Sequence, residues 1–312
     1  MLPMIDLHCD TLYEATKNGK SLIKNDLHLS FERLCEYPRF CQVMAVWSAS
    51  SLDCEGAWEN FFKARKLLAE ELKRTEKVRQ IFSADDLDNA ENDGVGGVIL
   101  AVEGGKLIGR DLSRLDILHN AGVRFITLTW DDPCNICGSN KTGGGLTDFG
   151  KDVLLRMFSL GIIPDVSHAS DEAIEDTVSF AEAHGRVCIA THSNSRAVCD
   201  HSRNLTDRLF LRIIKAGGVV GISMAPQHLS PSGKADISDI VRHIEHYMSL
   251  GGEDSVCLGC DLDGIERRPD GINNVNSITK IADALGRINY TDSIIKKIFY
   301  ANARNFISEW IK

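Results

Sequence analysis

Eight short runs of apolar and β-branched residues recur along the chain, and most are separated by enough residues to form a helix. They lie at 4–7, 41–46, 97–102, 125–128, 162–166, 187–190, 218–222 and 256–258. Residues 58–74 give the clearest helical pattern between them, with large apolar side chains every three to four positions. Strands that alternate with helices predict a parallel sheet, and eight such units predict a closed (β/α)8 TIM barrel.

Three further helices are predicted at 112–122, 148–161 and 170–185. Ser170 is expected to cap the start of the last one, and Gly161 and Gly185 are expected to follow the ends of the second and third. No linker, repeat or low-complexity segment divides the 312 residues. A barrel of this type typically has about 250 residues, so we expect one catalytic domain over 1–312.

Charge and composition indicate which binding partners and which cellular compartment to expect. The chain has 35 basic and 44 acidic residues and a net charge of −9, which provides no attraction to nucleic acid or anionic membranes. No signal peptide is recognised at the start, and no apolar run approaches the ~20 residues that span a bilayer. The ten cysteines lie mostly in apolar segments, as in proteins of a reducing compartment. We therefore expect a cytoplasmic protein that binds neither nucleic acid nor a membrane.

Side chains of the kinds that bind metal ions follow five of the predicted strands. They are His8 and Asp10, Glu103, His168, His192 and Asp261. Active sites of such barrels lie at the carboxyl ends of the strands, so these side chains are expected to share one rim. His8 and Asp10 are two positions apart and should point to the same face of their strand. The sequence thus predicts a metal site at this rim.

Simpler interpretations stay open for single residues. A lone histidine is more often a hydrogen-bonded core or surface residue than a metal ligand, and the prediction rests on the joint pattern. Asp6, Asp165 and Asp263 neighbour the predicted ligands; we expect them to hold a ligand histidine or a loop in place.

Two Cys-x-x-Cys pairs, Cys134 with Cys137 and Cys257 with Cys260, suggest a zinc ribbon at first sight. Such sites place both pairs in tight turns, whereas Cys257 lies inside the eighth apolar run. Residues three apart on a strand point to opposite faces. We therefore expect no shared zinc site, and free thiols at Cys134 and Cys137.

Taken together and in this order, the motifs resemble the membrane dipeptidase (renal dipeptidase) family of amidohydrolase-type metallopeptidases over nearly the whole chain. The motifs are D-x-H-x-D at Asp6, His8 and Asp10, E-G-G at Glu103, V-S-H at His168, T-H-S at His192, S-R-N at Arg203 and D-x-D-G at Asp261. The resemblance implies an amidohydrolase-like barrel that hydrolyses dipeptides at a binuclear zinc site. One ion would be held by His8 and Asp10, and the other by His168 and His192. Glu103 would bridge the two.

The chemistry of peptide hydrolysis agrees with this assignment. A metal ion lowers the pKa of bound water from 15.7 to about 7, which supplies a nucleophile at neutral pH. Asp261 is the expected general base and acid, which takes a proton from the water and passes it to the leaving amine; its alternative is a structural carboxylate at the rim. Arg203 is expected to bind the free carboxylate of a dipeptide, unless it merely pairs with Asp200 or Asp207.

One position departs from the family pattern. Many members carry a histidine after T-L-T on the fourth strand, where this chain has Trp130. Tryptophan has one hydrogen-bond donor and cannot carry a positive charge, so the range of substrates is expected to differ. We assign Trp130 to substrate binding.

Other functions remain open at this level. Deaminases, lactonases and nucleases on the same barrel usually carry H-x-H in the first motif, often with a carboxylated lysine as the bridge. A metal-stabilised binding protein without turnover is expected to have lost Asp261 or a ligand, and none is missing here. We expect tolerance of D-residues at the C-terminal position. The sequence leaves open the choice among zinc, manganese and cobalt and whether two chains form a homodimer.

Overall fold

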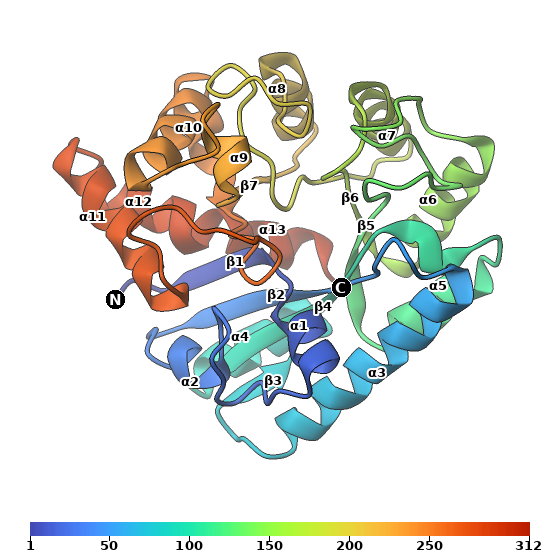
Figure 1. The fold of residues 1–312 in the computed structure, drawn as a ribbon, viewed down its shortest axis with the longest axis horizontal. Helices are drawn as coiled ribbons and strands as arrows, with labels where there is room; N and C mark the ends of the chain where they lie inside the picture. Colours follow the sequence, from blue (N-terminus) through green and yellow to red (C-terminus); the bar gives the residue numbers. More distant parts are fainter.

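The computed structural model describes residues 1–312 and contains eight strands, all paired in parallel (Figure 1). The strands are β1 Met4–Cys9, β2 Phe40–Trp47, β3 Val78–Gln80, β4 Gly96–Glu103, β5 Val123–Thr127, β6 Ile163–Asp165, β7 Val220–Ile222 and β8 Val256–Leu258. Their order is β6-β5-β4-β2-β1-β8-β7, and β3 pairs only with β4.

The segment 187–190 closes this sheet into a ring. Ile189 pairs with Asp165 of β6, and Ala190 pairs with Val220 of β7, as isolated parallel bridges. Seven strands and this segment together form the ring, so eight parallel chain segments surround the barrel. The predicted (β/α)8 barrel is confirmed. Two details of the strand prediction are wrong: 187–190 forms bridges and no regular strand, and β3 was not predicted.

The helices surround the barrel (Figure 1). They are α1 Thr11–Asn18, α2 Phe31–Leu34, α3 Cys54–Leu72, α4 Ala84–Asn92, α5 Ser113–Asn120, α6 Asp148–Leu160, α7 Asp171–Ala183, α8 Asp207–Lys215, α9 Pro226–Leu229, α10 Ile237–Ser249, α11 Thr279–Arg287, α12 Asp292–Lys296 and α13 Asn302–Trp310. Short 3-10 turns lie at Gly105–Ile108, Gly252–Asp254 and Val275–Ile278, and a π-helical turn lies at Lys297–Ala301. None of the helices combines the length and apolar character that crossing a membrane requires.

The helix ends follow the predicted capping chemistry. The Ser170 side chain accepts a hydrogen bond from the Ala173 amide and starts α7. Gly161 adopts the left-handed conformation, with φ of 72°, directly after α6. Helix α3 begins four residues before the predicted 58–74 because the Asp53 side chain caps it by accepting from the Gly56 amide.

Two apolar clusters form the core. The smaller has 21 buried residues and takes one or more from β1, β2, β4, β5, β6, β8 and the segment 187–190, such as Ile5, Val43, Ile99 and Ile189, together with Val219 just before β7. These residues fill the inside of the barrel, and residues of α4 and α13 also belong to the cluster. The larger has 70 buried residues and includes the inner faces of the helices. Residues two apart on a strand share a face, so Glu103 continues the inward row of Ile99 and Ala101 and emerges at the open end of the barrel.

Candidate metal centre

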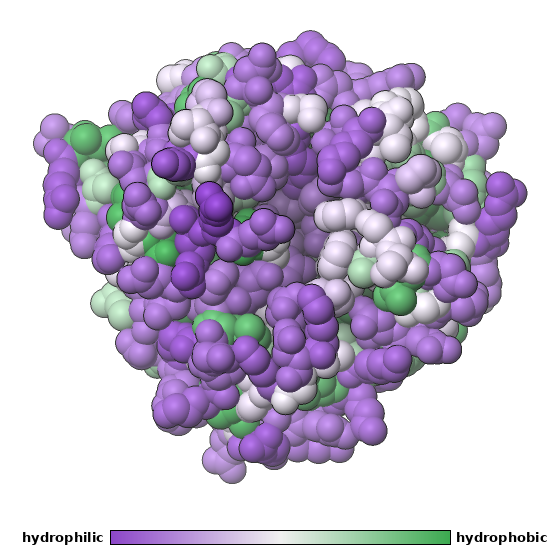
Figure 2. Space-filling model, viewed as in Figure 1, coloured by the Kyte–Doolittle hydropathy of each residue, from purple (hydrophilic) through white to green (hydrophobic).

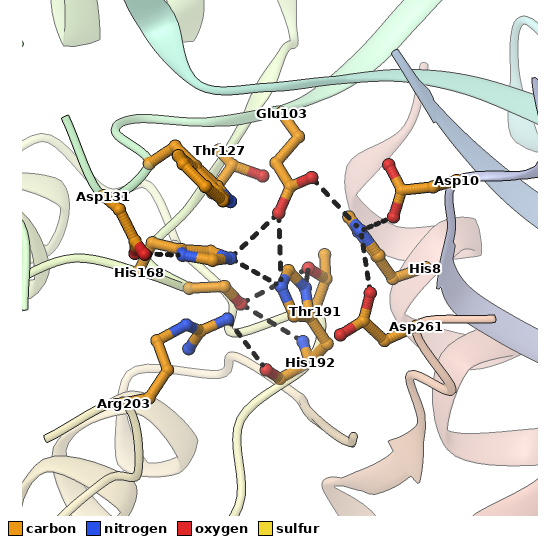
Figure 3. Close-up of polar contacts among 12 residues, drawn as sticks. His8, Asp10, Glu103, Thr127, Asp131, His168, Thr191, His192, Arg203 and Asp261 are labelled. Carbon is orange, nitrogen blue, oxygen red and sulfur yellow. Dashed lines mark hydrogen bonds and ion pairs between the residues drawn. The ribbon is translucent and has the colours of Figure 1, made fainter. Parts of the chain in front are cut away.

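The structure brings all six predicted ligand-type side chains together at the carboxyl ends of the barrel strands (Figure 3). His8 lies near the end of β1, and Glu103 is the last residue of β4. The other four side chains lie shortly after β1, β6, the segment 187–190 and β8; they are Asp10, His168, His192 and Asp261. His8, Asp10, Glu103 and His192 are each at most 4% exposed. The site is therefore built from groups that the fold has removed from water.

The side chains form two adjoining groups that meet at Glu103. On one side, His8 Nε2 lies 3.3 Å from Asp10 Oδ2, 3.7 Å from Glu103 Oε2 and 3.9 Å from Asp261 Oδ1. On the other side, Glu103 Oε1 lies 2.9 Å from His168 Nε2 and 3.4 Å from His192 Nε2. The two oxygens of one carboxylate thus face two separate sets of nitrogen atoms.

The protonation of His192 follows from its neighbours. The Thr191 hydroxyl donates its only proton to Asp165 Oδ2 at 2.6 Å. His192 Nδ1 lies 2.8 Å from the same hydroxyl oxygen, so Nδ1 must donate there. In the neutral ring, Nε2 then carries a lone pair that points toward Glu103.

His168 has a similar arrangement with a different partner. Its Nδ1 lies 3.3 Å from Asp131 Oδ1, which accepts only, so Nδ1 donates and Nε2 again carries the lone pair. The Nε2 atoms of His168 and His192 are 3.1 Å apart beside the Glu103 carboxylate. Two lone pairs beside an anion form an arrangement that favours a cation.

The pKa values of His8 and Asp10, in the other group, are both raised. Burial and the charge of Glu103 raise the pKa of Asp10 to about 6. Burial lowers the pKa of His8, but the Glu103 and Asp10 carboxylates outweigh it and raise that pKa well above its usual range. His8 Nε2 also has no hydrogen-bond partner although it is buried. The group thus favours positive charge at its centre.

These observations fit a divalent metal ion. His8, Glu103 and His192 offer ligand atoms within 4.8 Å of one another, as do His8, Asp10 and Asp261. Imidazole nitrogen and carboxylate oxygen are the ligands of catalytic zinc sites, which keep one position open for water or substrate. No cysteine belongs to either group, and all ten cysteines are free thiols.

The backbone is strained at the same rim. Only four non-glycine residues have positive φ, and three of them are His168 at 71°, Asp261 at 59° and Asp263 at 68°. Such residues are rare away from turns and cluster at functional sites. The surrounding loops hold these side chains in place at a cost in conformational energy.

The three neighbouring aspartates, Asp6, Asp165 and Asp263, all accept hydrogen bonds that hold the strands and loops around the site. Asp6 Oδ1 accepts from the Cys260 amide at 2.8 Å and the His8 amide at 3.2 Å, and so ties the ends of β1 and β8 together. Asp165 accepts from the Thr127 and Thr191 hydroxyls, both at 2.6 Å. Asp263 accepts from Thr11 Oγ1 and from the His28 amide.

Arg203 is buried beside the cluster without an acidic partner. Its guanidinium donates to Ser193 Oγ and to the His192 carbonyl, both at 3.3 Å, and its Nε has no partner. The alternative pairing with Asp200 or Asp207 is wrong, because no carboxylate lies within 4.0 Å of Arg203 and Asp207 pairs with His246 at 2.8 Å. Burial lowers the pKa of Arg203. A buried cation without an anion is costly, so this one is poised to bind an anionic ligand.

A cavity of about 360 Å³ opens over the cluster, in the range of small-ligand pockets, ~300–1,000 Å³. Its lining includes Glu103, His168, Arg203, Asp261 and Trp130. The face shown in Figure 2 is mostly hydrophilic and is hollowed near its centre. The unpaired guanidinium and several side chains of the ligand cluster thus line one cavity.

Several residues of this cavity were not predicted from the sequence, among them Tyr13, Trp47 and Asp131. Tyr13 and Trp47 join Trp130 in an aromatic wall, with ring centroids 5.0 Å apart in each neighbouring pair. Asp131 contacts His168 and follows Trp130 directly. Trp47 is the last residue of β2, as Glu103 is the last residue of β4. This position at the end of a strand was the sequence signal that could have placed Trp47 in the site. Asp131 had no such signal because it lies within a loop.

Comparisons with known proteins agree with this geometry. The family model described as membrane dipeptidase (Peptidase family M19) matches residues 1–309. An uncharacterized protein in the pqqA 5′ region of Klebsiella pneumoniae is 31% identical over 257 residues, which cover 78% of this chain and 92% of that protein. An uncharacterized dipeptidase of Schizosaccharomyces pombe is 31% identical over 242 residues. The match covers 75% of this chain but only 55% of the yeast protein.

Solved structures share the fold. A crystal structure of a metallopeptidase from Rhodobacter sphaeroides, liganded with a phosphinate mimic of the dipeptide L-Ala-D-Ala, has a TM-score of 0.91 at 24% identity and covers 100% of this chain and 99% of its own. The dipeptidase AC, a metallopeptidase of family M19, has a TM-score of 0.92 at 25% identity, with 99% of both chains covered. The predicted amidohydrolase-like barrel is confirmed by these structures.

Proposed function

This chain belongs to the membrane dipeptidase family, peptidase family M19, and on that premise we propose that it hydrolyses free dipeptides at a binuclear zinc centre. Membership confirms the predicted enzyme class, a metallo-dipeptidase. The proposal adds the metal, the number of ions, the role of each residue and tolerance of D-residues at the C-terminal position of the substrate. It treats residues 1–312 as one catalytic unit that works in the cytoplasm, a reducing compartment suited to ten free thiols.

Five side chains would hold the metal ions. His8 and Asp10 would bind one ion, His168 and His192 would bind the other, and Glu103 would bridge them because its two oxygens face the two groups. Bound zinc lowers the pKa of coordinated water to about 7 and polarises the scissile carbonyl. Manganese or cobalt would suit the same ligands.

Asp261 is proposed as the general base and acid. It lines the cavity, and its Oδ1 lies 3.9 Å from His8 Nε2, beside the place where the substrate carbonyl would lie. Burial and the neighbouring carboxylates Asp10 and Glu103 raise its pKa well above the usual range. A carboxylate with a raised pKa accepts a proton more readily than an ordinary aspartate, and it can then pass the proton to the leaving amine.

Arg203 is proposed to bind the C-terminal carboxylate of the substrate. Its guanidinium faces the same cavity as the ligand cluster and has no carboxylate partner. An arginine fork matches a carboxylate with two parallel hydrogen bonds. A substrate whose free carboxylate follows one residue after the scissile bond would be able to bind Arg203 and the metal centre together. This geometry would restrict the enzyme to dipeptides.

Trp130 is proposed as a substrate contact in place of the histidine found in many family members. It lines the cavity between Trp47 and His168, with ring centroids 5.0 Å and 5.8 Å away. The wall it forms with Trp47 and Tyr13 offers apolar surface and no positive charge. Polarising the substrate carbonyl would then be left to the metal ions, while Trp130 contacts a substrate side chain.

One observation carries the proposal: an unpaired, buried guanidinium shares one cavity with a cluster whose histidine lone pairs converge on a carboxylate. The test is an assay of L-Ala-L-Ala and L-Ala-D-Ala with the purified protein, before and after dialysis against a chelator. We expect hydrolysis of both isomers, loss after dialysis and recovery with zinc. Hydrolysis that survives removal of all metal contradicts the proposal. Cleavage of the L,L isomer alone removes only the tolerance of D-residues.

A further inference from the structure

We propose that Asp131 is a positioning residue for His168, which orients the imidazole, holds the proton on Nδ1 and thereby sets the affinity of the second metal site. The inference rests on the proposed function, in which His168 is a metal ligand. It assigns a role to an acidic residue outside the ligand cluster itself.

Both oxygens of the Asp131 carboxylate are engaged. Oδ1 accepts from His168 Nδ1 and from Asn140 Nδ2, each at 3.3 Å, and Oδ2 pairs with Lys141 Nζ at 2.5 Å. The carboxylate is thus fixed by two neighbours on its own loop while it faces the histidine. A fixed acceptor at Nδ1 leaves the Nε2 lone pair free to point at Glu103.

The same loop also fixes the backbone of His168. The Asn140 amide donates to the His168 carbonyl at 2.8 Å, and Ser139 pairs with Ala169 as a short antiparallel bridge. These contacts hold His168 at a φ of 71°, a conformation that is uncommon for residues other than glycine. Residues 139 and 140 therefore set the main chain, and Asp131 sets the rotation of the ring.

The two histidines of this group differ in the charge of their supports. His192 Nδ1 faces the neutral hydroxyl of Thr191, buried at 2% exposure. His168 Nδ1 faces an anion at the edge of the cavity. A charged acceptor makes the imidazole a more basic ligand, and outer partners of this kind typically change metal affinity by about 10–100-fold. We infer that the site shared by these histidines depends on Asp131.

Asp131→Asn tests the inference, because the amide keeps the size and one acceptor oxygen but removes the charge. Asp132→Asn is the matched control: Asp132 is the next residue and pairs with Lys106 at 2.9 Å without reaching a histidine. Zinc affinity is measured by dialysis of each purified protein against zinc buffers with elemental analysis. Nitrogen-15 NMR of His168 in the zinc-loaded proteins reports whether Nδ1 keeps its proton. Circular dichroism checks folding.

We expect Asp131→Asn to weaken the second equivalent of zinc by about 10–100-fold and to leave the first within about threefold. Its His168 Nδ1 signal should shift, while Asp132→Asn should match the parent in both readouts. Lys141→Met, which keeps the carboxylate but frees it, should give a smaller loss in the same direction.

Two other outcomes separate the claims. If the parent binds two equivalents and a folded Asp131→Asn binds both as tightly, the positioning role is wrong and the proposed function stands. If the parent itself binds one equivalent under zinc-replete conditions, the binuclear centre is wrong and the role of Asp131 at a second site falls with it.

Discussion

The Nε2 atoms of His168 and His192 lie 3.1 Å apart, and both face one oxygen of Glu103. Each ring uses its Nδ1–H as a hydrogen-bond donor: His168 donates to Asp131, and His192 donates to Thr191. The two nitrogens therefore cannot satisfy each other by a hydrogen bond between neutral rings. The proposed metal centre would place a cation beside both nitrogens, and the predictions below follow from that proposal and from the cavity above it.

Arg203→Met should lower kcat/KM for dipeptides by about ten- to a hundredfold, since a charge-assisted hydrogen bond to a carboxylate is worth about 1.5–3 kcal/mol. Metal content should stay unchanged. A dipeptide amide lacks the carboxylate, so it should be a poor substrate for the parent and lose much less on mutation. Arg208→Met serves as the control because Arg208 is an exposed residue of α8 that pairs with Glu175. An unchanged ratio between dipeptide and amide would make Arg203 purely structural.

Asp261→Asn should reduce kcat by about 10²–10⁴-fold, the usual contribution of a general acid or base. Asparagine tolerates the left-handed backbone of this position, where φ is 59°, so the loop should keep its shape. Steady-state kinetics and elemental analysis are measured on the same preparation. A fall in kcat of less than tenfold with full metal content would remove Asp261 from proton transfer.

Replacing both Cys134 and Cys137 with serine should leave dipeptide hydrolysis and bound metal nearly intact. The two thiols lie in the loop between β5 and α6, and neither belongs to a group that could hold a metal ion. Burial raises the pKa of both thiols, so they are poor metal ligands at neutral pH. Elemental analysis decides the point; a large loss of zinc in the double variant would mean that these cysteines bind metal.

His243 should make the fold less stable as the pH falls. It is fully buried, its Nδ1 accepts from the Ser195 amide, and its Nε2 donates to the Leu229 carbonyl. Burial lowers its pKa from 6.5 to about 4. The unfolded chain therefore takes up a proton below pH 6.5 that the folded chain takes up only near pH 4. The stability conferred by neutral His243 is complete above pH 6.5 and is lost as the pH falls toward 4.

The contribution of His243 is isolated by comparison with His243→Gln. One pKa unit corresponds to about 1.4 kcal/mol, so the parent should lose about 2 kcal/mol more than the variant in unfolding free energy between pH 7 and pH 5. Urea denaturation of both proteins at the two pH values, with metal removed from both, provides the measurement. Equal losses in parent and variant would show that His243 titrates normally in the folded protein.

Much of the fold could be predicted because its pattern is periodic. Apolar runs separated by amphipathic helices specify a parallel barrel whatever the loops do. The strand Val78–Gln80 was missed because it has three residues, two of them polar, and pairs only with the first residues of β4, Gly96 to Val98. The segment 187–190 is apolar, but it contacts its neighbours through single bridges, which sequence does not distinguish from a strand.

The meeting of the six ligand-type side chains could be predicted for a related reason: strand ends meet at one rim, so position along the chain translates into position in space. The supporting contacts could not be predicted in this way. Asp131 reaches His168 because the loop before residue 140 folds back over it, and no local pattern indicates that path. The missing partner of Arg203 is likewise a property of packing, because Asp207 turns to His246.

Activity as a function of bound zinc tests the central claim most directly. Metal-free protein is titrated with zinc, and hydrolysis of L-Ala-D-Ala and L-Ala-L-Ala is measured at each equivalent. The two ligand groups around Glu103 predict no hydrolysis without metal and a plateau at two equivalents per chain. Undiminished hydrolysis by metal-free protein, or a plateau at one equivalent, would contradict the proposal of a binuclear dipeptidase.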